Sequence, residues 1–242
     1  MNAELRKLFA LPTPRWTLAA TIAGVAIAAL VAALAGPGNG EDLLPMQLGI
    51  GLTTSIAAIV LGAWMIGVEY GQKTLRRALT ADPRRPRLLL AKLAVVLGAV
   101  TVATLVLVAV SAPAFSAIAS AHGESMPVRE SFEYGLAALL NNLVYATVGF
   151  ALALATRSMA GGMALALAFA FVIDSGLSVI PTVGDYSLSA AVLELMAGIS
   201  GDRVNGMPSG DPEIARGLAV TAAWLTALLG VSVARFTRSD VD

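Results

Sequence analysis

The chain has 242 residues, of which 57% are hydrophobic and 13% are charged, and its formal net charge is zero. A soluble domain carries about 25% charged residues, so this composition, with a mean hydropathy of +0.78, excludes a soluble globular protein and indicates an integral membrane protein. Because the sequence contains no cysteine, a disulfide framework and a thiolate metal site are also excluded.

Six apolar segments are long enough to cross a bilayer as helices, since about 20 residues span the hydrocarbon core. Strands of a transmembrane barrel would alternate apolar and polar residues, whereas these runs are continuous and rich in Ala, Leu and Val. The sequence therefore predicts an all-α membrane protein with a single transmembrane domain over residues 1–242. Its expected spans are residues 17–35, 48–68, 93–115, 136–156, 159–180 and 217–234.

The residues before the first span have an amphipathic pattern. One face carries Leu5, Leu8 and Phe9, and the other carries Glu4, Arg6 and Lys7. Pro12 and Pro14 end the pattern, because proline does not continue a helix. We expect an elbow helix that lies in the inner interface of the membrane, with a frayed cytoplasmic tail as the alternative.

The N-terminus also resembles a signal peptide, because basic residues precede an apolar run that ends Ala33-Leu34-Ala35. That run is about nineteen residues long, which exceeds the 7 to 15 residues of a signal-peptide core. Five further spans follow it. We therefore expect the run to remain as the first transmembrane helix.

The connection between the second and third spans is strongly basic. Lysine and arginine accumulate on the cytoplasmic side of membrane proteins, and this connection, the fourth-to-fifth connection and both termini collect thirteen of the sixteen. The sequence therefore predicts cytoplasmic N- and C-termini, as an even number of spans requires. Glu69, at the inner end of the second span, is expected to pair with an arginine or with the elbow helix. The connection holds Lys73, Arg76, Arg77, Arg84, Arg85, Arg87 and Lys92.

Part of this basic connection is patterned as a short helix. Residues 69–80 are mostly helix formers, with Leu75 and Leu79 four residues apart, and Asp82-Pro83 ends the segment. A helix here would present Tyr70, Leu75 and Leu79 on one side and cations on the other. The cations have an alternative explanation, which is that they only keep the loop on the cytoplasmic side and bind anionic lipids.

Motifs for catalysis are not evident. Residues 67–74 superficially resemble a P-loop, but Gln72 replaces the glycine required before Lys73, and a membrane helix precedes the segment in place of a buried strand. The single histidine, His122, lies in an outside loop, and no zinc-binding His-Glu-x-x-His pair occurs. These observations argue against an intramembrane enzyme.

Polar residues inside the spans are candidates for a translocation path, because polar groups are costly in a bilayer. Asp174 lies in the outer part of the fifth span and faces either such a path or water at its mouth. Asn141 and Asn142 lie in the fourth span, where hydrogen bonds between helices are the alternative to substrate contact.

The last outside connection, residues 181–216, is the longest. Its first half has apolar residues at helical spacing, which predicts a short helix in the outer interface. Its second half, residues 200–212, is rich in Gly, Asp, Asn and Pro and is expected to form a loop. The apolar face consists of Leu188, Ala191, Val192, Leu195 and Ile199.

The sequence resembles the membrane subunit of type-2 ABC exporters, the ABC-2 permeases. The resemblance is carried by Glu69-Tyr70, by Thr74-Leu75-Arg76-Arg77 with Leu79-Thr80, and by Pro83 followed by Arg87 to Lys92 at the head of a span. The layout is similar over the whole chain, with an N-terminal interfacial helix, six spans, both ends inside and short interfacial helices before the last span.

The resemblance implies that residues 71–81 form a coupling helix that docks on a separate cytoplasmic ATPase. ATP and Mg²⁺ would bind in that ATPase, so this chain would hold no cofactor and no metal and would catalyse no reaction. The expected partners are an ATPase dimer, a second or homologous permease and the lipid bilayer of a bacterial cell membrane, and no nucleic acid. The contacting residues would be Tyr70, Gly71, Lys73, Thr74, Leu75, Arg76, Arg77 and Leu79.

The spans contain few polar side chains, which favours export of a lipophilic or amphipathic cargo such as a drug, lipid or peptide. An ion-coupled secondary transporter is one alternative, and it would show inverted repeats and polar sites near the midplane. A non-transporting membrane sensor or immunity protein is the other. Abundant Ala and Gly, including Gly149 and Gly161-Gly162, favours close helix packing and dimerisation.

Overall fold

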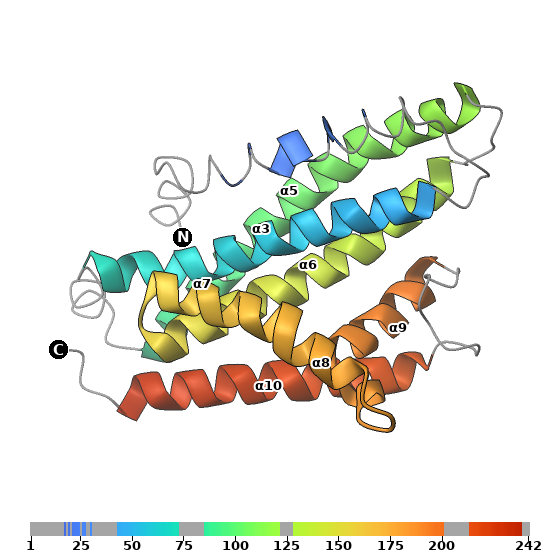
Figure 1. Ribbon diagram of the computed structural model, residues 1–242. Helices are drawn as coiled ribbons and strands as arrows, with labels where there is room; N and C mark the ends of the chain where they lie inside the picture. The colour runs from blue at the N-terminus through green and yellow to red at the C-terminus, as the bar shows by residue number, and fades with distance from the viewer. Residues whose placement is uncertain are drawn as a thin grey trace.

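The computed structural model describes residues 43–72, 85–121, 128–200 and 213–238, together with scattered helical residues between 17 and 30. Every regular element in the four continuous ranges is a helix, and Figure 1 shows the long helices running roughly side by side. The elements are α3 (Leu43–Gly71), α5 (Arg85–Ala121), α6 (Val128–Thr156), α7 (Met159–Ala168), η2 (Phe169–Ile173), α8 (Asp174–Ser178), η3 (Gly184–Tyr186), α9 (Leu188–Ser200) and α10 (Ile214–Arg238).

Five helical segments in the described ranges are long and apolar enough to cross a membrane. The chain is thus a multi-pass helical membrane protein, as its composition predicts. The sixth expected span, residues 17–35, and the elbow helix with Leu5 to Phe9 lie wholly or largely outside the described residues, so six spans and cytoplasmic termini stay predictions. The five segments are Thr53–Gly71, Arg87–Ile118, Phe132–Thr156, Met159–Ser178 and Ile214–Arg238.

The helices extend beyond the spans expected from hydropathy. Those expectations were residues 93–115 for α5 and 136–156 for α6, whereas the helices cover Arg85–Ala121 and Val128–Thr156. Hydropathy detects only the part of a helix that is apolar enough for the hydrocarbon core. The polar turns beyond that part continue the same backbone hydrogen bonding.

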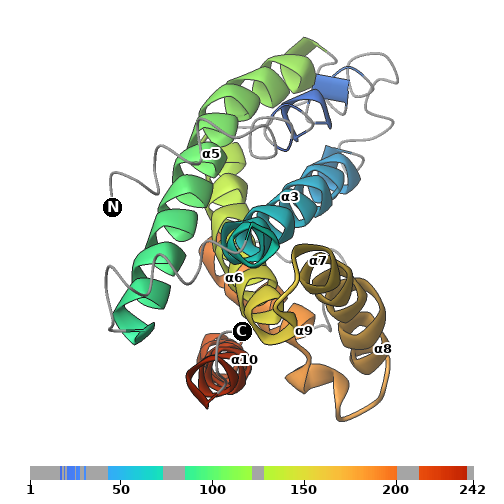
Figure 2. The same ribbon diagram turned by 90° about the vertical axis from the view of Figure 1, so that its left-hand side faces the viewer.

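Helix α6 is the centre of the bundle. It packs against α3, α5, α7, α9 and α10, whereas α3 and α5 contact each other far less than each contacts α6. Figure 2 shows α6 surrounded by these neighbours, with α3 and α5 diverging on one side. Most of the α3 and α6 spans is buried inside the chain, whereas less than a third of the α5, α7–α8 and α10 spans is buried.

Glycines allow α3 and α6 to approach closely. A Cβ atom added at Gly62 would overlap the carbonyl oxygen of Ala146, and one added at Gly149 would overlap the carbonyl oxygen of Ile59. In membranes, small residues at a helix interface let the backbones come together and maximise van der Waals contact. Close packing was expected at Gly149, and the structure places it between two helices of the same chain.

The link between α6 and α7 is the two-residue turn expected at Arg157-Ser158. Arg157 has a left-handed backbone with φ of 56°, and its N–H donates to the carbonyl oxygen of Ala153 at 2.9 Å. Ser158 is the N-cap of α7, and its Oγ accepts a hydrogen bond from the Gly161 N–H at 3.2 Å. Both helix ends are therefore closed locally, which makes the turn compact.

The fifth span is interrupted by a π-helical segment, η2. A π-helical turn holds an extra residue and so changes which side chains face the bundle. Phe171, Val172 and Ile173 point outward, between 43% and 68% exposed, and the next residue, Asp174, is fully buried. The π-helical turn thus precedes the point at which a carboxylate enters the bundle interior.

The helix expected near residues 188–199 is present as α9. Four of the five residues of its expected apolar face are buried, and Ile199 is 40% exposed. Helix α9 packs against both α6 and α10, and Glu194, Ala197 and Ser200 are buried as well. Its buried surface is thus wider than the expected stripe, because it contacts two helices. Its position at the outer interface of a membrane stays a prediction.

Candidate functional site

The end of α3 and the start of α5 are joined by a buried ion pair. The Lys92 Nζ lies 2.6 Å from the Glu69 Oε1, and the two side chains are 0% and 2% exposed. Lys92 was counted among the cations of the basic connection, but it lies five residues inside the Arg87–Ile118 span. The partner carboxylate explains how a lysine is accommodated there, since a charge buried without a partner is strongly unfavourable.

Only the start of the expected coupling helix lies in the described part of the chain. Tyr70 is half-buried and packs against a hydrophobic cluster of α3, α5, α6 and α10, and Gly71 ends α3 with open space where a Cβ would lie. The structure therefore places Tyr70 against the chain's own core, on the last turn before the basic connection. The other expected contacts, Lys73, Thr74, Leu75, Arg76, Arg77 and Leu79, lie outside the described residues.

Asn141 and Asn142 hydrogen-bond to neighbouring helices. The Asn141 Nδ2 donates to the Ser55 Oγ of α3 at 2.6 Å, and the Asn142 Nδ2 donates to the Thr104 Oγ1 of α5 at 3.1 Å. Asn142 is the midpoint of α6, with fourteen residues before it and fourteen after it. The two asparagines thus tie the central helix to both of its neighbours at mid-depth.

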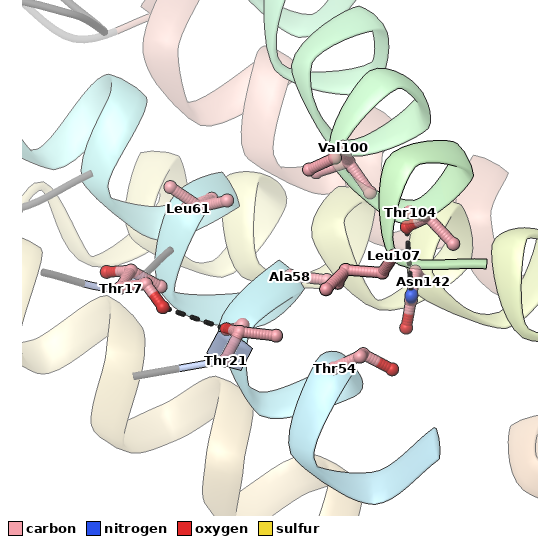
Figure 3. A pocket seen from close by; sticks show the side chains of 11 residues that line it. Thr17, Thr21, Thr54, Ala58, Leu61, Val100, Thr104, Leu107 and Asn142 are labelled. Carbon is pink, nitrogen blue, oxygen red and sulfur yellow. Dashed lines mark hydrogen bonds between the residues drawn. The ribbon is translucent and has the colours of Figure 1, made fainter. Parts of the chain in front are cut away.

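A small cavity adjoins Asn142 among the first predicted span, α3, α5 and α6 (Figure 3). The volume in which the centre of a water molecule fits is about 30 Å³. One water needs roughly 10 to 15 Å³ by this measure. Thr21 and Thr54 line it and donate their own hydroxyl protons to backbone carbonyl oxygens. Among the described residues the buried Asn142 Oδ1 accepts no hydrogen bond. The cavity is lined by uncharged polar groups, and the Asn142 Oδ1 could accept a hydrogen bond from a water or another small donor.

The bond between Asn142 and Thr104 is expected to contribute little to stability. In a double-mutant cycle of Asn142→Ala and Thr104→Val, we expect a coupling free energy of about 0.6 kcal/mol, typical of hydrogen bonds between membrane helices. Thermal unfolding in detergent measures it. Asn142→Ala with Thr54→Val is the matched control, because Thr54 lines the same cavity and bonds to its own helix. Equal couplings in the two cycles would contradict the expectation.

Asp174 accepts hydrogen bonds from the start of α9. Its Oδ1 accepts from the Leu188 N–H at 2.7 Å, and its Oδ2 accepts from the Ser189 N–H at 2.8 Å. The Ser187 Oγ accepts from the next amide, that of Ala190, at 3.2 Å. The first three amides of α9, which no helical carbonyl can satisfy, are therefore all paired. The negative charge of Asp174 also suits the positive end of the helix dipole.

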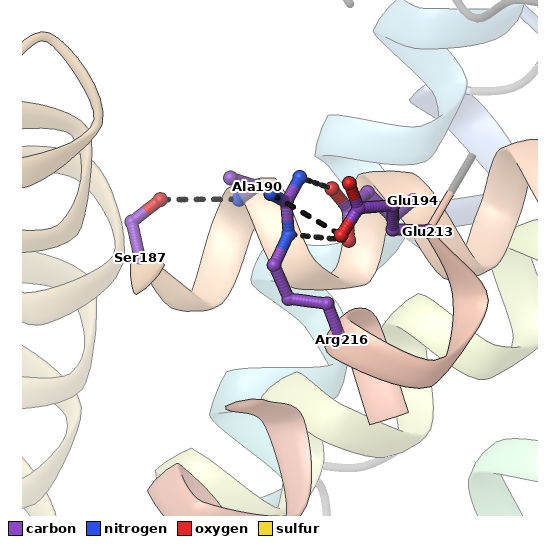
Figure 4. A network of polar contacts seen from close by, with 5 residues as sticks. All are labelled: Ser187, Ala190, Glu194, Glu213 and Arg216. Atoms are coloured by element: carbon purple, nitrogen blue, oxygen red, sulfur yellow. Dashed lines mark hydrogen bonds and ion pairs between the residues drawn. The ribbon is translucent and has the colours of Figure 1, made fainter. Parts of the chain in front are cut away.

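A second ion pair joins α9 to α10, as Figure 4 shows. Arg216 contacts Glu194, and its Nη1 lies 3.5 Å from the Glu213 Oε2. Glu194 is buried and Arg216 is 31% exposed, so the guanidinium covers a carboxylate that would otherwise be buried alone. This pair fixes the start of α10 beside α9.

Trp224 links α10 to the segment before α9. Its Nε1 donates to the Tyr186 carbonyl oxygen at 3.0 Å, and its ring meets that of Phe169 in an edge-on contact with centroids 5.4 Å apart. The indole thus satisfies its polar atom while packing its apolar body in the bundle. Trp224 thus holds α10 against the fifth span, while the ion pair holds it against α9.

The expected path residues fall into two groups. Asn141 and Asn142 lie together at mid-depth, whereas Asp174 belongs to the contact between α8 and α9. Sequence reasoning missed the pairing of Glu69 with Lys92 and of Glu194 with Arg216. The available signal was that Lys92 and Glu194 each stand in an otherwise apolar helical pattern, where a charge needs a partner.

Among the described residues, no group of three or more His, Asp or Glu side chains could hold a metal ion. The charged residues buried in these ranges are Glu69, Lys92, Asp174 and Glu194, and each has a contact with another part of the chain. Their arrangement supports packing and positioning of helices.

Comparison with known proteins gives one match. A family model described as ABC-2 family transporter protein matches residues 3–173. The matched stretch includes the basic connection and both asparagines, and it ends immediately before Asp174. Neither a curated protein nor a solved structure matches the chain.

Proposed function

Because the chain belongs to the ABC-2 family of transporter proteins, we propose that it is the permease subunit of an exporter driven by a separate cytoplasmic ATPase. The observation that carries the proposal is the family match over most of the chain, together with five described helices that can each cross a membrane. Membrane proteins of this family are typically the non-catalytic component, and in general they work with an ATPase subunit.

The proposed contact with the ATPase is the basic connection between α3 and α5. It falls inside the matched stretch and combines cations with Leu75 and Leu79 at helical spacing. Apolar spacing of this kind is not needed to fix a loop on the cytoplasmic side, so it favours a docking role. Arg76, Arg77 and Lys73 would then pair with acidic groups of the partner.

The proposed cargo is lipophilic or amphipathic and moves outward. Two observations support this choice: the described spans are almost wholly apolar, and the polar groups at mid-depth are uncharged. Such a lining offers little to replace the water shell of an ion. A pair of permeases and a pair of ATPases would complete the transporter.

Reversing the charge of the docking segment is expected to weaken the complex. We expect Arg76→Glu/Arg77→Glu to reduce the affinity for the ATPase about tenfold or more, because like charges at an interface oppose binding. Leu75→Ala/Leu79→Ala should act in the same direction through lost apolar contact. The measurement is co-purification with a candidate ATPase followed by titration binding.

Arg85→Glu/Arg87→Glu is the matched control, since it makes the same charge change in the first turn of α5, outside the docking segment. We expect near wild-type binding from it. Equal weakening by both double variants would show that total charge, and not the docking segment, sets the affinity. A chain that binds no ATPase and moves solute on an ion gradient would replace the proposal with a secondary transporter.

A further inference from the structure

The ion pair between Glu69 and Lys92 joins the two helix ends that border the basic connection. Glu69 is two residues before the end of α3, and Lys92 is seven residues after the start of α5. The chain between these helices, residues 72–84, carries most of the proposed docking segment. The pair therefore stands where a force on this connection would enter the two spans.

Stability alone is a weak reason to bury this pair. Removing two charges from water costs about as much as their attraction returns, so a buried ion pair is often no better than apolar side chains of similar volume. Lys92 also lies only about 10 Å from the start of α5, at 1.5 Å per residue, within reach of the inner interface for a long side chain that extends towards water. It is instead 0% exposed and directed at Glu69.

The surrounding packing gives the pair a mechanical role. Helices α3 and α5 diverge in Figure 2 and contact each other far less than each contacts α6. At the inner end, Ile66 and Leu89, three residues before Glu69 and Lys92, belong to a buried cluster that also contains Phe150 of α6 and Phe236 of α10. The cluster connects α3 and α5 by way of α6, and the ion pair connects them directly.

We propose that Glu69 and Lys92 form a positioning clamp that holds the inner ends of α3 and α5 at one separation, so that a displacement of the basic connection moves both spans together. This role rests on the proposed function, because it gives the pair a place in the transfer of motion from the ATPase. The clamp itself is a property of the permease and can be measured without the ATPase.

The absence of cysteine allows a direct test. Spin labels at Gln72→Cys and Arg87→Cys, both exposed, report the separation of the two helix ends by pulsed electron paramagnetic resonance on the full chain in lipid nanodiscs. With the pair intact we expect one narrow distance distribution. In Glu69→Met/Lys92→Met we expect a broader distribution with a longer mean. An unchanged distribution in this variant would overturn the clamp.

Two further variants separate positioning from folding. Glu69→Met/Lys92→Met is expected to keep the wild-type Tm, because apolar replacement of both partners removes the cost of desolvation. Should it fail to fold, the exchanged pair Glu69→Lys/Lys92→Glu replaces it, with a narrow distribution expected and a broad one contrary to the clamp. Arg129→Met/Glu133→Met, which removes an exposed pair on α6, is the matched control and should leave the distribution unchanged.

The complex with the ATPase provides the second arm. We expect the labelled wild-type chain to keep the same distance with and without ATP, and the apolar double variant to change distance on ATP addition and to lose transport. A distance that changes on ATP addition in the wild type would overturn the clamp. Failure to bind any ATPase would overturn the proposed function, while the result in nanodiscs would still decide the role of the pair.

Discussion

Gly62→Ala is expected to lower the free energy of unfolding by about 3 kcal/mol, the upper part of the usual range for overpacking. The added Cβ would overlap the Ala146 carbonyl oxygen, which belongs to the α6 backbone and cannot move without separating the helices. The loss would fall on the contact between α3 and α6, where most of each span is buried. Thermal or denaturant unfolding in detergent measures the change.

Gly98→Ala is the matched control for this prediction. Gly98 lies in the middle of α5 and has nothing within 4 Å of an added Cβ. Alanine favours a helix over glycine by about 1 kcal/mol, so this variant is expected to be as stable as the wild type or more stable. The same substitution should thus have opposite signs at the two positions. Equal effects would show that α3 and α6 do not approach as described.

Asp174→Ala is expected to cost about 3 to 5 kcal/mol, because it leaves the Leu188 and Ser189 amides without acceptors and removes a charge-assisted bond to each. Hydrogen exchange should rise at the first turn of α9 while the amides of α3 stay protected. The two measurements together locate the loss at the start of α9.

Two variants control for the charge and for the number of acceptors. Asp174→Asn retains one carbonyl oxygen and should fall between alanine and the wild type. Asp185→Ala removes an exposed aspartate from the neighbouring η3 segment and should change stability by less than about 0.5 kcal/mol. If Asp174→Ala were as stable as the wild type while transport was lost, Asp174 would serve the path and not the start of α9.

Hydropathy predicts the five described spans because the backbone of a long apolar run has to form its hydrogen bonds within the run. A helix does this without a partner segment. The turn at Arg157-Ser158 was equally readable, since two apolar runs are separated there by only two polar residues. The helix at residues 188–199 was predictable from the helical spacing of its apolar residues. In these cases the information is local, so the sequence contains it.

The contacts of the buried charges were not readable in this way. Asp174 meets amides fourteen and fifteen residues further along the chain, and Glu194 meets a guanidinium twenty-two residues away. Such pairings depend on how helices pack and on where η2 shifts the register of the fifth span, neither of which has a periodic signature. Asp174 stood out in the sequence as a charge inside a span and Glu194 did not, and packing determines the partners of both.

Helix α5 contains the longest candidate span of the described residues. Its span of 32 residues, Arg87–Ile118, is about 48 Å long, whereas the hydrocarbon core of a bilayer is about 30 Å thick. A helix of this length fits the bilayer by tilting, by thickening the lipid around it or by placing its charged first turns in the interface. Since α5 carries Lys92, its inclination is linked to the end of α3. We therefore expect a change in bilayer thickness to act on the helix end that also borders the basic connection.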